Sequence, residues 1–387
     1  MALTKRIIYF DNAATTFCAP KVAEALAEFF KTPHGNPSGA HHLAFESSQV
    51  IKKSREFFAS HFKVKPEQVV FTASGTEANN LALSGLLQKI SPKEKKIILT
   101  TPIEHSSVLM TLETWAKRGF ELQFLKVDRE GFVSLEDLAQ KISPSVALVS
   151  IMAVNNEIGT IQPIEQIGTL LRKKDFSIPF HVDGVQAFGK IPLEFGAWGV
   201  NLLSMSSHKI HGPIGAGALI TDGKMRLEPL LWGGGQEHGL RSGTESIGMI
   251  YGFYLAACDI LQNQNKNREA VLALKQKFIE GVRKLSFDVK LNTPEQSSPY
   301  ILNLSFKGCE SEVLLRMLEE EGIFVSPGAS CNAKKRKPSH VLKGIGCVDS
   351  EIFSALRFSF SPYTKESEID EALKVLPPIL SRLQNLK

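Results

Sequence analysis

Residues 204–219 read SMSSHKIHGPIGAGAL, which places Lys209 directly after a histidine and ahead of a glycine-rich run. Lysine is costly to bury and usually lies at the surface. This lysine follows the short apolar stretch 200–203 and precedes GPIGAGAL, a pattern typical of a turn followed by a buried strand. The sequence therefore predicts a lysine at the end of a buried strand, and the fold must account for it.

Strand-like and helix-like segments alternate from about residue 20 to residue 260. The strand-like segments are short and rich in apolar or β-branched residues, and they read QVVFTA (68–73), KIILTT (96–101), ELQFLKV (121–127), VALVSIMAV (146–154), FHVDGV (180–185) and VNLLSMS (200–206). Helical periodicity marks KVAEALAEFFK (21–31) and TEANNLALSGLLQKI (76–90), and we expect the second to begin at a Thr76 cap. The alternation indicates an α/β fold whose mostly parallel sheet is covered by helices on both faces.

The pattern changes near residue 262, where the polar stretch QNQNKNREA (262–270) leads into one long helix. The strands YILNLSF and ALRFSFS and the helix SEVLLRMLEEEG follow, and they predict a smaller α+β domain. We therefore expect a large domain of residues 16–262 and a small domain formed by residues 1–15 and 263–387. No internal repeat is present in the sequence, which excludes solenoid architectures.

The composition is that of a soluble globular protein, with 387 residues of which 43% are hydrophobic and 22% charged. The net charge of +5 is mild and the basic residues are scattered, so we expect no nucleic-acid partner. The N-terminus MALTKRIIYFDNAATT lacks the apolar core of a signal peptide, and no apolar run is long enough to span a membrane. We expect a cytoplasmic protein that does not bind membranes.

The five cysteines are odd in number and form no CxxC pair, so we expect neither a disulfide framework nor a structural metal. Cys331 lies in IFVSPGASC (323–331), a loop of small residues, and the basic run KKRK (334–337) follows it. Positive charge favours the thiolate, which makes Cys331 a candidate reactive thiol. A free surface cysteine beside a solvated basic patch is the alternative interpretation.

Several polar residues follow the predicted strands, at the sheet edge where α/β proteins bind ligands. Ser74, Gly75 and Thr76 lie between a strand and a helix start, where backbone N–H groups favour an anion, although ordinary helix capping is the alternative. His105 follows the strand KIILTT, but a lone histidine is more often structural than catalytic. Asn156 lies in the polar turn that follows VALVSIMAV.

Asp183 ends the strand FHVD, and Gln186 follows three residues later. A buried carboxylate needs a partner, which is a heterocyclic nitrogen in the functional interpretation and an ion-pair partner or a helix terminus that it caps in the structural one. A lysine, a carboxylate and an anion site at neighbouring strand ends are what pyridoxal phosphate requires of a protein. Burial and nearby cationic groups lower the pKa of such a lysine, so Lys209 can act as nucleophile and base.

Two further segments offer donors for anionic groups. The loop GGGQEHGLRSGTES (233–246) contains Thr244 and suits phosphate or carboxylate binding across a dimer interface, with a plain surface loop as the alternative. Arg357 is flanked by apolar residues in ALRFSFS, and its guanidinium suits a bidentate clamp on a substrate carboxylate.

Taken together, these motifs resemble the cysteine desulfurases, which belong to the class V aminotransferase-like branch of pyridoxal-phosphate enzymes. The resemblance covers nearly the whole chain and includes YFDNAATT, GNPSGAHHLA, SGTEANNLAL, EHSSVL, VNNEIGTIQP, HVDGVQAFGK, SSHKIHGPIGAGAL, GGGQEHGLRSGT, EGIFVSPGASC and LRFSFSPYTKESEID. It implies a fold-type I transferase, with a mostly parallel seven-stranded sheet in the large domain and a smaller α+β domain.

The resemblance also implies residue roles. Lys209 would be the Schiff-base lysine, His105 would stack on the cofactor ring and assist proton transfer, and Cys331 would accept the sulfur. The cofactor-binding residues it implies are Gly75, Thr76, His105, Asn156, Asp183, Gln186, Ser206, His208, Lys209 and, from the second subunit of a homodimer, Thr244. Asn156 and Arg357 would bind the substrate, and no metal site is implied beyond transient ligation of a cluster by Cys331.

The spacing from Cys331 to KPSHVL (337–342) resembles the long-loop subgroup, which passes sulfur to scaffold proteins for iron–sulfur clusters and to tRNA thiolation. Two departures from the usual loop of this family leave the identity of the sulfur acceptor open. Asn332 stands where the family usually has Thr or Ser, and the KKRK run stands where it usually has small residues. The expected partners are L-cysteine, an acceptor or scaffold protein and a second copy of the chain. The alternatives are a selenocysteine lyase or aminotransferase of the same branch, and a non-catalytic binding protein whose lysine is structural.

Overall fold

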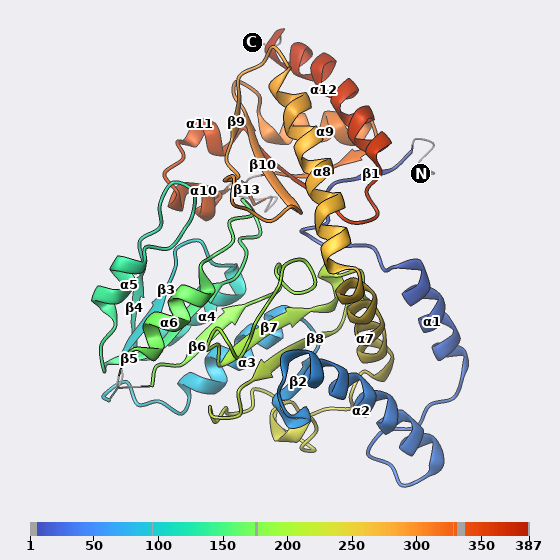
Figure 1. Ribbon diagram of the computed structural model, residues 1–387, viewed down its shortest axis with the longest axis vertical. Coiled ribbons are helices and arrows are strands. Elements are labelled where there is room, and N and C mark those ends of the chain that lie inside the picture. Colours follow the sequence, from blue (N-terminus) through green and yellow to red (C-terminus); the bar gives the residue numbers. More distant parts are fainter. Residues whose placement is uncertain (1–5, 95, 175–176, 328, 331–336, 386–387) are drawn as a thin grey trace.

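The computed structural model describes residues 6–94, 96–174, 177–327, 329–330 and 337–385. In Figure 1 a seven-stranded sheet occupies the lower part of the molecule and a four-stranded sheet the upper part. Helix α8, Gln264–Arg283, begins beside α7, Ile247–Gln262, and continues along the upper part. The last helix, α12 (Glu366–Asn385), packs beside α8.

The large sheet has the strand order β2-β8-β7-β6-β5-β3-β4. Its strands are β2 Val69–Thr72, β3 Ile97–Thr100, β4 Glu121–Phe124, β5 Val146–Met152, β6 Phe180–Asp183, β7 Leu202–Ser206 and β8 Gly217–Thr221. All neighbouring pairs are parallel except those of β8, which runs antiparallel to both β2 and β7. The predicted mostly parallel seven-stranded sheet is confirmed.

The register of β8 brings two strand ends together. Thr72, the last residue of β2, and Ser206, the last residue of β7, both pair with Gly217. A Cβ atom at Gly217 would lie 2.6 Å from the carbonyl carbon of Ser74, so only glycine allows this approach. The start of helix α3 is thereby held beside the end of β7.

Successive strand residues face opposite sides of the large sheet. Val70 packs in a cluster with helices α3 and α4, whereas Val69 and Phe71 pack in the cluster that contains α2, α6 and α7. These helices are α2 His42–Phe62, α3 Gly75–Leu87, α4 Ser106–Ala116 and α6 Ile164–Arg172. Both faces are buried, which explains why the strands read as continuous apolar runs.

The four-stranded sheet has the order β12-β15-β10-β9, with every neighbouring pair antiparallel. Its strands are β9 Val289–Leu291, β10 Ile301–Phe306, β12 Ser326–Pro327 and β15 Ala355–Ser359, and helix α9 is Ser311–Glu320. Strand β1, Ile8–Tyr9, pairs in parallel with β11, Ile323–Phe324. The first described residues therefore lie beside a segment that is more than 300 positions later in the chain.

The remaining elements are short or peripheral. They are α1 Pro20–Lys31, α5 Leu135–Lys141, α10 His340–Gly344, α11 Asp349–Ile352, β13 Ala329–Ser330, β14 Lys337–Pro338 and the 3-10 helices Pro66–Gln68, Ser207–Lys209 and Glu237–Gly239. Within the described part of the chain, no helix is long and apolar enough to cross a membrane.

Two local predictions are wrong. The cap of α3 is Ser74 rather than Thr76, because the Ser74 hydroxyl accepts a 3.1 Å hydrogen bond from the backbone N–H of Glu77. Thr76 is instead the second residue of the helix. The polar stretch after residue 262 is not a lead-in, since α8 begins at Gln264 directly after α7 ends. The stretch covers the end of α7 and the beginning of α8, and its side chains are exposed or half-buried.

Candidate active site

A cavity of about 380 Å³ lies at the carboxyl ends of the strands, where Met152, Asp183 and Ser206 end β5, β6 and β7. The predicted site residues that line it are Gly75, Thr76, His105, Asn156, Asp183, Gln186, Ser206, His208, Lys209 and Arg357. The cavity is also lined by Ala13, Ala14, Asn79 and Ser107, which sequence reasoning did not single out. Segments from both ends of the chain therefore meet at one place.

Two of the predicted site residues are not among the described residues that line this cavity. Thr244 is exposed and is not one of the lining residues. Cys331 and the first three residues of the KKRK run lie outside the described residues. Lys337, the last residue of that run, is exposed in β14.

Lys209 is the last residue of the 3-10 helix that follows β7. Its Nζ donates hydrogen bonds to the backbone carbonyls of Ala13, at 2.7 Å, and Ala14. Burial, followed by the charge of Arg357, lowers the pKa of Lys209 to about 8. A substantial share of the amine is therefore neutral in mildly basic solution, and a neutral amine is a nucleophile and a base.

Asp183 receives two hydrogen bonds at the end of β6. Its Oδ2 accepts from Nδ2 of Asn79 at 2.8 Å, and its Oδ1 accepts from the backbone N–H of Val185 at 2.9 Å. Asn79 is the one polar side chain among the buried residues of α3. The sequence does not single it out, because it stands beside Asn80 and close to Thr76 and Glu77.

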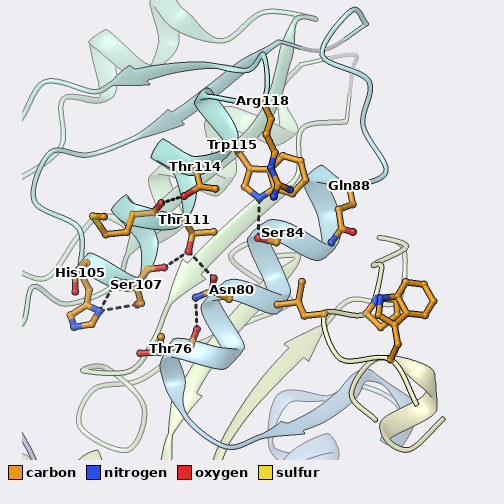
Figure 2. A pocket seen from close by; sticks show the side chains of 15 residues that line it. Thr76, Asn80, Ser84, Gln88, His105, Ser107, Thr111, Thr114, Trp115 and Arg118 are labelled. Atoms are coloured by element: carbon orange, nitrogen blue, oxygen red, sulfur yellow. Dashed lines mark hydrogen bonds between the residues drawn. The ribbon is translucent and has the colours of Figure 1, made fainter. Parts of the chain in front are cut away.

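His105 is the N-cap of α4 and has a fixed orientation. The backbone N–H of Ser107 donates to His105 Nδ1 at 3.1 Å, so the neutral ring carries its proton on Nε2. Burial is the main cause that lowers the pKa of His105, which favours this neutral form. Figure 2 shows Ser107 beside the imidazole at the start of α4.

The start of α3 forms the anion-attracting part of the cavity. Gly75 and Thr76 are its first two residues, and their backbone N–H groups have no partner within the helix. A Cβ atom at Gly75 would lie 2.6 Å from Cγ2 of Val185, so this position must be glycine. Among the described residues, the buried hydroxyl oxygen of Ser206 has no hydrogen-bond partner.

His208 lies beside this region with Nδ1 3.1 Å from the Thr15 hydroxyl oxygen. Burial, and then the charges of Lys209 and Lys190, lower the pKa of His208 to about 4. The ring is therefore neutral under physiological conditions. It can offer an anion one N–H donor and no charge.

Arg357, in β15, has a carboxylate partner that the sequence did not indicate. Its Nη2 donates to Oδ1 of Asp11 at 2.8 Å and to the Ser326 hydroxyl at 3.0 Å, and its Nη1 donates to the carbonyl of Asn156 at 2.9 Å. Asp11 is 346 positions away in the sequence, so no spacing pattern indicates the pair. The guanidinium is held rigidly at the cavity wall.

A second, more open cavity of about 650 Å³ adjoins the first and shares Thr76, His105 and Ser107 with it. Figure 2 shows that it runs along the facing sides of α3 and α4. Hydrogen bonds link these helices, from Trp115 Nε1 to Ser84 at 2.9 Å and from Thr111 to Asn80 at 2.9 Å. The lining of this second cavity contains no lysine, aspartate or glutamate. The candidate catalytic groups therefore lie in the smaller cavity.

Side chains that could bind a metal ion do not cluster in the described part of the chain. Across residues 6–94, 96–174, 177–327, 329–330 and 337–385, no group of three or more His, Cys, Asp or Glu side chains is arranged to hold a metal ion.

The sheet order, together with a lysine and an aspartate on adjacent strand ends, defines a fold-type I transferase. A family model described as Aminotransferase class-V matches residues 8–372. The cysteine desulfurase IscS of Dictyoglomus turgidum is 39% identical over 383 residues, which are 99% of this chain and 96% of that protein. The cysteine desulfurase IscS of Clostridium botulinum strain Kyoto is 38% identical over 382 residues, with shares of 98% and 96%.

A solved structure named NifS-like protein matches the fold with a TM-score of 0.92 and 36% identity, covering 97% of this chain and 100% of that one. The chain therefore belongs to the class V aminotransferase family and, within it, to the cysteine desulfurases.

Proposed function

We propose that this chain uses pyridoxal phosphate to convert L-cysteine to L-alanine and that it holds the released sulfur as a persulfide on Cys331. The observation that carries the proposal is the cavity in which Lys209, Asp183 and the start of α3 meet. Membership in the cysteine desulfurases supports the choice of substrate.

The donor set of the cavity fits pyridoxal phosphate. The start of α3 and the unpartnered hydroxyl oxygen of Ser206 suit its phosphate, and the glycine at position 75 lets this helix start pack against Val185 and Ser206. We assign Gly75, Thr76, Ser206 and His208 to the phosphate. The partner subunit's Thr244 would complete the set, because Thr244 of the same chain does not line the cavity.

When bound, pyridoxal phosphate supplies an aldehyde that joins an amine and an electron sink for a carbanion at the substrate α-carbon. The chain supplies the groups around it. Asp183, oriented by Asn79 and Val185, would pair with the protonated ring nitrogen. Lys209, with its lowered pKa, would take and return the proton at the substrate α-carbon.

The substrate carboxylate would bind Arg357, whose orientation is fixed by Asp11 and Ser326. His105, neutral and protonated on Nε2, would stack on the cofactor ring and pass a proton during the reaction. Asn156 and Gln186 would contact the ring and its 3-hydroxyl.

The sulfur step belongs to Cys331. Its thiolate would attack the sulfur of the substrate, so that an S–S bond forms and the substrate C–S bond breaks. The electron pair of the broken bond stays with the carbon, which takes up a proton to become the methyl group of alanine. The outer sulfur of the persulfide keeps the thiol proton of the substrate. Atoms and electrons therefore balance, and no external oxidant or reductant is needed.

The larger assembly is part of the same proposal. It is a homodimer, and each chain has a large domain of residues 16–262 and a small domain formed by residues 1–15 and 263–387. The sulfur would then pass to an acceptor or scaffold protein for iron–sulfur clusters or tRNA thiolation, in the cytoplasm.

Intact-mass measurement after incubation with L-cysteine tests the proposal. The wild-type chain should gain the mass of sulfur and release alanine in equal amount, and reductant should then liberate sulfide. The Cys331→Ser variant should bind pyridoxal phosphate but gain no mass. A Cys331→Ser variant that releases sulfide at the wild-type rate would refute the role of Cys331. A wild-type chain that binds no pyridoxal phosphate would refute the whole proposal.

A further inference from the structure

Lys190 is a buried lysine that the proposed chemistry does not use. It is 5% exposed, and its Nζ donates to Oε1 of Gln186 at 2.9 Å. Among the described residues no carboxylate forms an ion pair with it, and its amine instead lies 5.7 Å from the centre of the Tyr300 ring. Burying a lysine without a carboxylate is costly, so a protein keeps one only where something offsets that cost.

The backbone conformation before Lys190 brings this amine into contact with the Gln186 side chain. Gly189, directly before Lys190, has a φ of 73°, a conformation that other residues rarely adopt. A Cβ atom at Gly189 would also lie 2.8 Å from Cγ2 of Ile260. The turn therefore requires glycine, and it returns the chain so that Lys190 reaches the amide four positions earlier.

The contacts of Gln186 fix the positions of the oxygen and the nitrogen of its side-chain amide. Its Oε1 accepts from Lys190, and its Nε2 donates to the carbonyl of Ala13 at 2.8 Å. A carbonyl can only accept and an ammonium group can only donate. Rotating the amide by half a turn would therefore set nitrogen against the lysine and oxygen against the carbonyl, and both bonds would be lost.

This orientation reaches the candidate active site. Gln186 lines the cavity, and Ala13 uses only one of the two hydrogens on Nε2. The other hydrogen remains for an acceptor in the cavity. The same Ala13 carbonyl accepts from Lys209, so the amide and the reactive lysine share one anchor on the N-terminal segment.

We propose that Lys190 is a positioning residue, which holds the amide of Gln186 so that an N–H donor, and not a carbonyl oxygen, is presented to an anionic ring oxygen of the bound cofactor. The inference rests on the proposed function, because it takes pyridoxal phosphate as the molecule in the cavity. Burial and the charges of Lys209 and Arg357 lower the pKa of Lys190 to about 7, so the bond to Gln186 is charge-assisted in acidic solution and loses that charge as the pH rises through about 7.

The test measures the affinity of the full-length apoprotein for pyridoxal phosphate by equilibrium dialysis, together with the visible absorbance of the bound cofactor at several pH values. Lys190→Met keeps the length of the side chain and removes the donor. We expect it to weaken binding about tenfold, the effect of one lost hydrogen bond, and to shift the pH at which the absorbance changes.

Two comparisons make the test specific. Lys275 is also 5% exposed, but its partners Ser297 and Ser298 do not line the cavity as Gln186 does, so Lys275→Met should destabilise the fold and leave both readouts unchanged. Gln186→Leu should weaken binding as Lys190→Met does. Because Lys190 acts through Gln186, the double variant should bind no more weakly than Gln186→Leu alone.

Additive losses in the double variant, or equal changes in the Lys275→Met variant, would overturn the assignment. If Lys190→Met does not fold, Gln186→Glu serves instead, because a carboxylate pairs with Lys190 but presents no donor to the cavity. Because its second oxygen would face the Ala13 carbonyl, Gln186→Glu should lower the melting temperature as well as the affinity, and retained affinity would overturn the assignment. If wild-type protein binds the cofactor and these variants bind equally well, only this inference fails; if wild-type protein does not bind it, the proposed function fails.

Discussion

Asn79 connects Asp183 to His105 across the candidate active site. Its Nδ2 donates to Oδ2 of Asp183 at 2.8 Å and to the hydroxyl oxygen of Ser107 at 2.9 Å. The Ser107 hydroxyl in turn lies 2.8 Å from Nδ1 of His105. One amide on α3 thus orients both Asp183, at the end of β6, and His105, at the start of α4, and these are the two groups that would contact the cofactor ring.

Replacing Asn79 with alanine should therefore impair the site more than the fold. Asp183 would lose one of its two donors, and we expect pyridoxal phosphate to bind about tenfold more weakly. Asn80→Ala is the matched control, because Asn80 bonds to Thr76 and Thr111 but not to Asp183. Dialysis of the two apoproteins against the cofactor checks this, and equal affinities would contradict the role of Asn79.

Arg357→Lys should raise the KM for L-cysteine and leave cofactor content unchanged. Lysine is a point charge and cannot contact Asp11, Ser326 and Asn156 as the forked guanidinium does. We expect a rise in KM of about 10- to 100-fold, the effect of a lost charge-assisted hydrogen bond. Arg316→Lys, on the exposed side of α9, is the control in steady-state kinetics. An unchanged KM would exclude Arg357 from substrate binding.

Glu157→Ala should slow sulfur transfer while substrate binding persists. The Glu157 carboxylate accepts a 2.5 Å hydrogen bond from Ser339, which follows Cys331 by eight positions. Because this contact anchors the end of the cysteine-bearing segment to the turn beside Asn156, we expect persulfide formation to slow about tenfold. Single-turnover mass measurement gives the rate, with Glu312→Ala, at an exposed position, as control. A normal rate would show that the anchor has no part in the step.

The rate at which the apoprotein takes up pyridoxal phosphate should depend on the pKa of Lys209. Only the neutral amine attacks the aldehyde, and burial and Arg357 lower this pKa to about 8 from the ordinary value of 10.5. The neutral fraction, and with it the rate, should rise about tenfold per pH unit up to about pH 8 and then level off. Stopped-flow absorbance checks this. A rate that still climbs at pH 10 would show an ordinary lysine.

The linkage of this pKa to stability has a definite sign. The unfolded chain binds more protons than the folded chain between the two pKa values, so Lys209 makes the apoprotein more stable as pH rises from about 8 towards 10.5. Lys275, whose pKa burial lowers to about 8, contributes in the same direction. In thermal unfolding, the melting temperature of the apoprotein should rise between about pH 8 and pH 10.5, and that of Lys275→Met should rise less.

The fold could be predicted largely from the sequence because apolar strands and amphipathic helices are local patterns. The strand ends also indicated Lys209, Asp183 and His105, since a polar residue after a buried strand is conspicuous. The cap of α3 was misplaced because Ser74 and Thr76 both suit an N-cap and only the backbone geometry decides between them.

The partners of the site residues could not be predicted, for a different reason. Asp11 meets Arg357 across 346 positions, and Ala13 meets Lys209 across 196. Such contacts arise from the topology of the chain and leave no periodic trace in the sequence. Lys190 was visible only as a lysine in apolar surroundings, and Asn79 only as one of two adjacent asparagines, which does not reveal what either side chain binds.

The pairing of β1 with β11 has a consequence for biosynthesis. The N-terminal segment leaves the ribosome first, yet its hydrogen-bonding partners Ile323 and Phe324 and the guanidinium that binds Asp11 are translated more than 300 codons later. A nascent chain must therefore keep this segment unpaired until almost all of the polypeptide has emerged, and a prematurely terminated product would have no enzymatic competence.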